Sequence, residues 1–197
     1  SEVKTSEARA AAASRVPDIY TGPDMEIAGR QLQRLAEITA YIDAIRHDEF
    51  ADRAHKLTLV KEIPDLDLPE SVLTATITLD DAEWQSVVSE ATRVLDQVMR
   101  EEIRGSQLSE ARSSLRRRLS HALSAQQQAV VVALVENLTV PNSFFDAQQT
   151  TANREATGNA VEPVYWTILE GESILREGEI VTELALEKLQ VLELLST

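Results

Sequence analysis

Apolar residues recur every three or four positions through most of the middle of the chain, a spacing typical of amphipathic helices. The clearest stripe includes Trp84, Val87 and Val94. Thr78 or Asp80 is a suitable N-cap for it, with Asp81 or Glu83 three residues further on. The same spacing predicts helices over residues 24–50, 51–62, 80–104, 108–122, 124–138 and 146–159, and a last, leucine-rich helix from Thr182.

Two connectors interrupt this pattern. Residues 63–70 contain two prolines six positions apart, which favours an extended segment. Residues 165–183 repeat the phrase Glu-Gly-Glu at 170–172 and 177–179, between short β-branched stretches. Those stretches predict three short strands, and we interpret the two glycines as turns. A cation site is the alternative, but alternation along strands would spread the four carboxylates apart.

The two ends of the chain resemble each other. The positions Thr5, Arg9, Ala11, Val16 and Tyr20 recur, in order and spacing, as Thr150, Arg154, Ala156, Val161 and Tyr165. Each copy predicts a helix running into a short strand, so we expect the two strands to share one sheet. The predicted fold is α+β: predominantly helical, with a small β-sheet formed by the N-terminal and C-terminal segments. We expect one domain over residues 1–197, with a helical lobe at 24–138 and a β-containing lobe made of 1–23 plus 139–197.

Composition narrows the function. Nineteen basic and thirty-three acidic residues give a formal charge of −14, which argues against nucleic acid as a partner. The absence of cysteine excludes disulfides, thiolate catalysis and cysteine-type zinc sites. The longest uninterrupted apolar run, residues 129–135, is far shorter than the roughly 20 residues of a membrane helix. We expect a soluble segment, which could be one part of a larger protein.

No catalytic constellation is recognisable. His47-Asp48 is an isolated His-Asp pair, whereas a metal-dependent catalytic site needs several converging histidines and aspartates. Phosphate loops, nucleophile elbows and HExxH motifs are absent. We therefore expect no catalytic residue, no metal ligand and no cofactor in this chain.

The one basic cluster of this acidic chain comprises Arg112, Arg116, Arg117 and Arg118, with His121 nearby. This cluster is either a solvated helix face whose arginines pair with acidic neighbours, or a surface that contacts an anion or a lipid headgroup.

The C-terminal third carries a family resemblance. Asn142, Asp146, Thr150 and Arg154, followed by Val-Glu-Pro-Val at 161–164 and the two Gly-Glu phrases, resemble the extracellular domain of seven-transmembrane HD phosphohydrolases. The opening positions Thr5, Arg9, Val16 and Tyr20 and the Leu79–Trp84 phrase extend the resemblance over essentially the whole chain, although Glu193 stands where the family pattern leads us to expect glycine.

The resemblance implies a topology and a role. A membrane helix would precede Ser1, and a seven-helix membrane region and a cytoplasmic HD domain would follow Thr197. Members of the family are bacterial and include phosphodiesterases that hydrolyse cyclic di-AMP. The chain would be the extracytoplasmic sensory or regulatory domain of such a protein. The alternative is a ligand-free scaffold for dimerisation or for docking an envelope protein.

The repeated residues are the candidate ligand site. Arg9 and Arg154 could converge on an anionic ligand, with Tyr20 and Tyr165 as walls and Trp166 lining the pocket or covering the sheet. A structural role in pairing with carboxylates or helix ends is the alternative. The expected partners are an extracytoplasmic ligand or envelope protein, the protein's own transmembrane region and, as an open option, a second copy of the chain.

Overall fold

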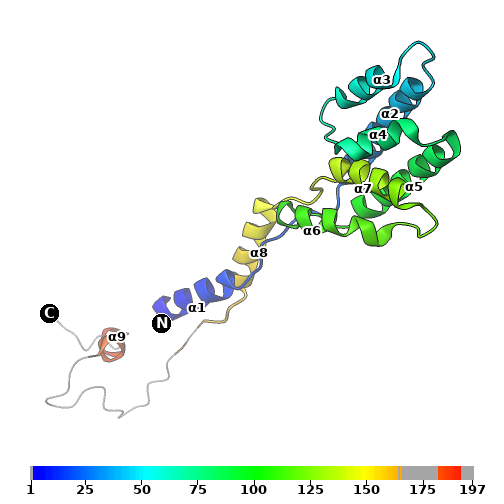
Figure 1. Cartoon of the computed structure of the whole chain (residues 1–197). Coiled ribbons are helices and arrows are strands. Elements are labelled where there is room, and N and C mark those ends of the chain that lie inside the picture. The colour runs from blue at the N-terminus through cyan, green and yellow to red at the C-terminus, as the bar shows by residue number, and fades with distance from the viewer. Residues whose placement is uncertain (1, 164, 166–181, 192–197) are drawn as a thin grey trace. The chain divides into compact units, whose positions relative to one another are not determined.

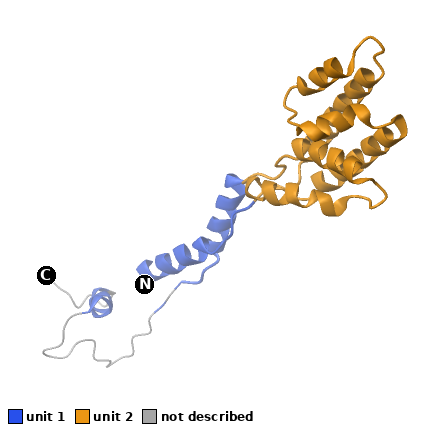
Figure 2. Cartoon of the chain, viewed as in Figure 1, with its two compact units in different colours: residues 1–19, 146–197 blue, residues 20–145 orange. Residues whose placement is uncertain are grey.

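The computed structural model describes residues 2–163, 165 and 182–191. The chain divides into two compact units (Figure 2). Unit 1 comprises residues 1–19 and 146–197, and unit 2 comprises residues 20–145. The chain therefore passes from one unit to the other twice, after Ile19 and before Asp146.

Unit 2 is a bundle of helices around one apolar core (Figure 1). The helix α5 packs against α7 and α2, and α4 packs against α7 and α3. Trp84, Leu95 and Leu134 are among the fully buried side chains. The elements of unit 2 are α2 (Met25–Arg46), α3 (Arg53–Lys61), α4 (Glu70–Thr78), α5 (Asp81–Met99), α6 (Leu108–Ser113) and α7 (Ala125–Leu138), with the 3-10 turns η1 (Gly105–Gln107) and η2 (Leu115–Arg118).

Side-chain caps explain where the predicted helices begin. The Asp80 carboxylate accepts a hydrogen bond from the Glu83 N–H, and the Glu83 carboxylate accepts one from the Asp80 N–H, a complete capping box. Ser124 and Gln127 make the same arrangement at the start of α7. The predicted helices α2, α3, α5 and α7 are thus confirmed, with ends a few residues inside the predicted limits.

The structure contains one helix that we did not predict, and it ends another earlier than predicted. Residues 70–78 form α4 although their sequence is rich in β-branched residues, because Val72 and Leu73 are buried in the core. The helix predicted over 108–122 ends at Ser113. Ser113 and Ser114 donate their hydroxyls to the carbonyls of Ser109 and Ala111, a local alternative that disfavours continuation of a helix.

Unit 1 contains α1 (Glu2–Ser14), α8 (Ala147–Asn159) and α9 (Glu183–Val191) among its described residues. The helices α1 and α8, which carry the two copies of the repeated phrase, pack against each other. Gly158 lies so close to α1 that a Cβ built on it would stand 3.5 Å from the Arg9 carbonyl oxygen. The repeat therefore pairs two helices.

The predicted β-sheet is wrong. The described residues contain no strand, only an isolated antiparallel bridge between Tyr20 and Phe145, so this part of the chain is all-α. Pro17 has no N–H to offer to a ladder, and the Ile19 N–H donates to the Thr150 hydroxyl at 2.8 Å. A side chain of α8 thus satisfies the backbone group that a neighbouring strand would have paired. The Glu-Gly-Glu phrases lie outside the described residues.

Candidate functional site

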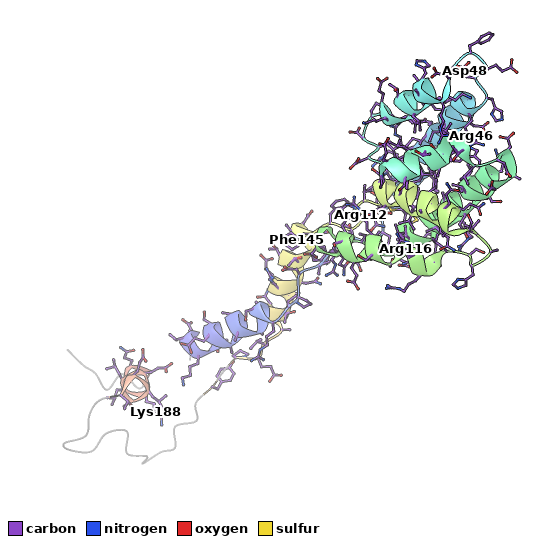
Figure 3. The ribbon with its side chains drawn as sticks, in the orientation of Figure 1. Arg46, Asp48, Arg112, Arg116, Phe145 and Lys188 are labelled. Carbon is purple, nitrogen blue, oxygen red and sulfur yellow. The ribbon has the colours of Figure 1, made fainter. Side chains whose placement is uncertain are left out.

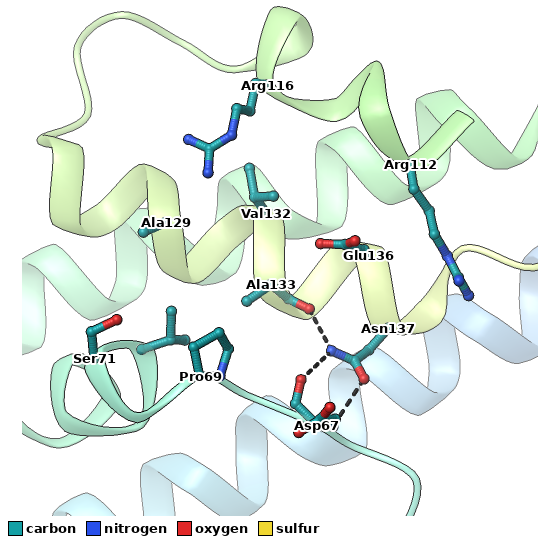
Figure 4. Close-up of a pocket in the computed structure, with 11 residues that line it drawn as sticks. Asp67, Pro69, Ser71, Arg112, Arg116, Ala129, Val132, Ala133, Glu136 and Asn137 are labelled. Carbon is teal, nitrogen blue, oxygen red and sulfur yellow. Dashed lines mark hydrogen bonds between the residues drawn. The ribbon is translucent and has the colours of Figure 1, made fainter. Parts of the chain in front are cut away.

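A cleft of about 570 Å³ opens on the surface of unit 2, within the size range of small-ligand sites. Three segments far apart in the sequence form it: the connector into α4, the outer face of α7, and the segment that carries α6 and η2 (Figure 4). The lining residues include Asp67, Ser71, Arg112, Arg116, Glu136 and Asn137, with Val72, Ala129, Val132 and Ala133 as apolar surface.

Asn137 fixes the connector against α7. Its side-chain carbonyl accepts the Asp67 N–H at 2.9 Å, and its amide donates to the Asp67 carbonyl oxygen at 2.8 Å (Figure 4). The same amide also donates to the Ala133 carbonyl oxygen. The Asn137 side chain thus pairs with both backbone groups of Asp67, as a neighbouring strand would do. The extended connector is therefore held in place without being part of a sheet. One wall of the cleft is thereby held in place.

The four clustered arginines have different environments. Arg118 makes a two-pronged ion pair with Glu101, at 2.8 and 2.6 Å, and its guanidinium holds the pKa of that carboxyl below the ordinary value. Arg117 is exposed and does not line the cleft. Arg112 and Arg116 do, and Figure 3 labels both on the segment that follows α5. Arg118 therefore pairs with an acidic neighbour, as one of the two predictions for the cluster had it. That Arg112 and Arg116 contact an anion stays a prediction.

Arg112 is the more fixed of the two cleft arginines. It is half-buried, and one terminal nitrogen donates to the Thr139 carbonyl oxygen at 3.2 Å. Its Nε is shielded from solvent and has no hydrogen-bond partner. The Arg116 side chain is exposed and makes no hydrogen bond or ion pair with another described residue. Arg112 is therefore oriented by the C-terminal end of α7, whereas Arg116 is the adaptable guanidinium of the cleft.

The residues predicted from the repeat are divided between the units. Arg154 pairs with Asp18 at 2.7 Å in unit 1, with side-chain exposures of 42% and 53%. Arg9 is exposed on α1, and among the described residues no common partner joins it to Arg154. Tyr165 is 80% exposed, and Trp166 lies outside the described residues. Their role in ligand binding stays a prediction.

Tyr20 belongs to unit 2 and sits in an aromatic cluster. Its ring meets that of Phe145 edge to face, with centroids 6.0 Å apart, and the Arg104 guanidinium lies 3.9 Å from the Tyr20 ring centroid. Arg104 also pairs with Glu102, which accepts a hydrogen bond from the Ser143 hydroxyl. These contacts give Tyr20 a structural role within unit 2.

The motif residues that carried the family resemblance also make structural contacts. Asn142 is fully buried: its side-chain carbonyl accepts the Ile103 N–H, and its amide donates to the carbonyls of Met99 and Glu101. It therefore closes the C-terminal end of α5, where helix carbonyls lack partners. In unit 1 the Asp146 side chain caps α8, and the buried Thr150 hydroxyl holds the Ile19 N–H.

His47, the first member of the His-Asp pair, contacts carboxylates but belongs to no metal cluster. Its ring nitrogens lie 3.2 Å from a carboxylate oxygen of Asp81 and 3.6 Å from one of Asp43. The Asp48 carboxylate instead accepts a hydrogen bond from the Phe50 N–H in the following loop. Across the described part of the chain, no group of three or more histidines and carboxylates could hold a metal ion. None of the described helices is both long and apolar enough to cross a bilayer.

The cleft was only partly foreseeable. Arg112 and Arg116 stand out in the sequence as a basic cluster in an acidic chain. Asp67, Ser71 and Glu136 carry no such signal, because residues 67 and 137 meet across seventy positions. An isolated acidic residue in a polar connector has many equally ordinary explanations.

The fold and cleft define a small helical domain with an open, charged groove. The sequence pattern of the family described as 7TM-HD extracellular matches residues 1–196, and the chain belongs to this family. The resemblance predicted from the sequence is thus confirmed. The family is the extracellular part of 7TM-HD proteins, distinct from their HD domain, which places the chain on the extracytoplasmic side of the membrane.

A curated relative agrees with this assignment. Over 74 residues the chain is 39% identical to the cyclic-di-AMP phosphodiesterase PgpH of Listeria monocytogenes serotype 1/2a (strain 10403S). The aligned part is 38% of this chain and 10% of that protein, so the chain spans only a small part of the relative's length. No solved structure matches the chain.

Proposed function

We propose that this chain is the sensory and regulatory domain of a membrane-bound HD phosphohydrolase and controls a cytoplasmic cyclic-dinucleotide phosphodiesterase. The observation that carries the proposal is the family match over residues 1–196. The Listeria relative is a cyclic-di-AMP phosphodiesterase, and its activity is the reaction that we propose is regulated. The domain itself needs no cofactor for this role, and its partners are an extracytoplasmic ligand and the protein's own membrane region.

The mechanism would be a population shift. A ligand that binds one arrangement of the domain more tightly than another favours that arrangement by its difference in affinity. The helix α9, Glu183–Val191, would carry the change towards the membrane region. The cleft of unit 2 supports the proposal because it offers a ligand a concave, charged surface with an anchored wall.

The test uses the longer membrane protein in vesicles and measures the rate of cyclic di-AMP hydrolysis. Trp84→Asp places a carboxylate in the core of unit 2 and disrupts that unit in place, whereas Phe50→Ala alters a fully exposed ring and is the matched control. We expect Trp84→Asp to change the rate at least about twofold with an unchanged oligomeric state, and Phe50→Ala to leave both unchanged. An unaltered rate in Trp84→Asp contradicts the proposal.

A scaffold for dimerisation or for docking an envelope protein is the second candidate. It is favoured by the exposure of two adjacent aromatic side chains on unit 2, Phe144 and Phe145. A scaffold predicts that the hydrolysis rate follows the fraction of dimer, as measured by light scattering over a range of protein concentrations. A sensor predicts a rate that varies at constant oligomeric state.

A further inference from the structure

The helix α2 has one side that the rest of unit 2 leaves uncovered. Leu35, Ile38 and Ile42 pack into the core, whereas the opposite side carries exposed residues from Glu26 to Tyr41. A shallow hollow on that side is lined by residues of α2 alone, namely Glu26, Gly29, Arg30, Gln33, Arg34 and Glu37. No other described segment of the chain contributes to this surface.

Gly29 has no explanation within a single chain. It lies in the first half of a regular helix, where glycine is less favourable than alanine. A Cβ built on Gly29 would meet nothing within 4 Å, so no contact in the described chain requires its absence. An exposed helical glycine does let the backbone of a second helix approach closely. This residue therefore favours contact of α2 with another helix.

The charged side chains of this surface lack ionic partners within the described chain. Glu26 and Arg30 make no side-chain hydrogen bond or ion pair with another described residue, although their i,i+4 spacing suits one. The Glu37 carboxylate accepts a hydrogen bond from the Gln33 amide at 3.2 Å and has no cationic partner among the described residues. The guanidinium of Arg30 and the carboxylates of Glu26 and Glu37 are therefore available to a partner.

The order of these residues along α2 fits an antiparallel copy of the same helix. Arg30 and Glu37 are two helical turns apart and lie on the same side of α2. In an antiparallel pair centred between residues 33 and 34, each Arg30 would face the partner's Glu37. The same register would set Tyr41, which is 48% exposed, opposite the partner's Glu26, whose carboxylate can accept the phenol hydroxyl. Each contact would occur twice, because a two-fold pair uses the same surface on both copies.

Other partners match this surface less well. A parallel copy of α2 would set each Arg30 against another Arg30 and each Glu37 against another Glu37. A uniformly positive surface would leave Arg30 without a partner, and a uniformly negative one would repel both carboxylates. An antiparallel second copy is the arrangement that gives every one of these charges an opposite charge or a hydroxyl.

We propose that two copies of the chain associate through antiparallel α2 helices, with Arg30–Glu37 ion pairs on both sides of a two-fold axis beside Gln33. The inference names a contact between copies and does not depend on the proposed regulation. Exposed ion pairs contribute little individually, so we expect a weak pair with a Kd of about 1 mM. A contact of this strength orients copies that already lie close together and does not set the oligomeric state of a longer membrane protein.

Disulfide trapping tests the register, because the chain has no cysteine of its own. Gln33→Cys places a thiol beside the two-fold axis, where the two Cα atoms can lie within the roughly 7 Å that a disulfide requires. Gln85→Cys places a thiol at an exposed position of α5 and measures random collision. With the 197-residue chain at about 0.5 mM and copper phenanthroline as oxidant, Gln33→Cys should form covalent dimer at least about tenfold faster than Gln85→Cys.

Charge reversal in the Gln33→Cys chain tests the ion pairs. Arg30→Glu and Glu37→Arg each set like charges opposite one another, so each should slow dimer formation about tenfold, although Glu37→Arg lowers the net negative charge. The double reversal restores opposite charges and should return the rate to within about twofold of its starting value. Arg117→Glu makes the charge change of Arg30→Glu outside α2 and should leave the rate unchanged. All of these positions are exposed, so circular dichroism should report the same folded domain.

Equal trapping of Gln33→Cys and Gln85→Cys would overturn the inference, and so would a double reversal as slow as the single ones. Trapping that is lost in Phe144→Ser but not in Arg30→Glu would also overturn it, because the copies would then meet through the exposed aromatic rings of unit 2. These results leave the proposed function standing if Trp84→Asp still changes the hydrolysis rate. An unchanged hydrolysis rate together with efficient trapping would instead reject the sensor and retain the α2 contact.

Discussion

The two units of this domain are stabilised by different kinds of interaction. Unit 2 buries a continuous cluster of apolar side chains from α2, α4, α5 and α7. In unit 1, the described buried side chains are Thr5, Thr150 and Ala185. Besides the packing of α1 against α8, its described segments are joined by polar contacts, among them the hydrogen bonds of the Ile19 backbone with Thr150 and Asp146 and the Arg154–Asp18 ion pair. Apolar burial dominates folding energy, whereas single hydrogen bonds and exposed ion pairs contribute little.

The two units should differ in how readily they open. A region with few buried side chains opens at a lower free energy than one with a continuous apolar core. We therefore expect amides of the described part of unit 1 to exchange with solvent faster than those of α5 and α7. Substitutions should have large, global effects in unit 2 and small, local effects in unit 1.

The largest effect is expected for Trp84→Ala in unit 2. Trp84 is fully buried, and the Arg46 guanidinium lies 5.3 Å from the centroid of the Trp84 ring. Truncation therefore leaves a cavity and removes a cation–π contact. Urea unfolding should show a loss of about 3–5 kcal/mol in the free energy of unfolding. Phe50→Ala, at a fully exposed ring, should change it by less than about 0.5 kcal/mol. Similar losses in the two variants would contradict a core centred on Trp84.

A smaller but still global effect is expected for Asn142→Leu. The substitution keeps the volume of the side chain but removes the partners of the Ile103 N–H and of the Met99 and Glu101 carbonyls. Buried backbone groups left without partners should cost about 2–3 kcal/mol in the free energy of unfolding. Asn137→Leu, at a half-buried position, is the control and should cost less, because water can reach the Asp67 backbone. Equal costs would mean that burial at Asn142 is unimportant.

A local effect is expected for Thr150→Val in unit 1. The variant keeps the shape of the side chain but removes the acceptor of the Ile19 N–H. Hydrogen exchange at the Ile19 amide should become faster by about fivefold, equivalent to about 1 kcal/mol, while exchange in α5 and α7 stays the same. Thr151→Val changes the exposed neighbour and should alter neither. Faster exchange throughout unit 2 would show that the two units unfold together.

The smallest effect concerns His47 and pH. A hydrogen bond with the Asp43 carbonyl, and then the Asp81 carboxylate, raise the pKa of His47 above its ordinary value. Because the folded chain binds this proton more tightly, the added stability is fully present below the unfolded pKa of about 6.5 and is lost as the pH rises through the folded pKa.

NMR titration of His47 tests this assignment. Asp81→Asn should lower its pKa but leave it above the ordinary value, since the Asp43 carbonyl remains. Asp96→Asn removes a carboxylate that pairs instead with Arg100, and it should leave the titration of His47 unchanged. An unchanged pKa in Asp81→Asn would exclude the ion pair.

The sequence alone located most of the helices and their caps, because apolar spacing and capping residues act within one or two turns. It also placed Trp84 on the apolar stripe of its helix and identified the family. It failed where tertiary contacts replaced local preference. Burial made residues 70–78 a helix, and the Thr150 hydroxyl took the backbone N–H that we expected a strand to pair.

The candidate site divides in the same way. The basic character of Arg112 and Arg116 is a property of the sequence, since four arginines stand together in an acidic chain. Only the tertiary structure decided which of them pairs internally and which lines a cleft, because Glu101, Asp67 and Glu136 approach from other elements. Local interactions are written along the chain, but the charges that face one another across a cleft depend on how distant helices pack.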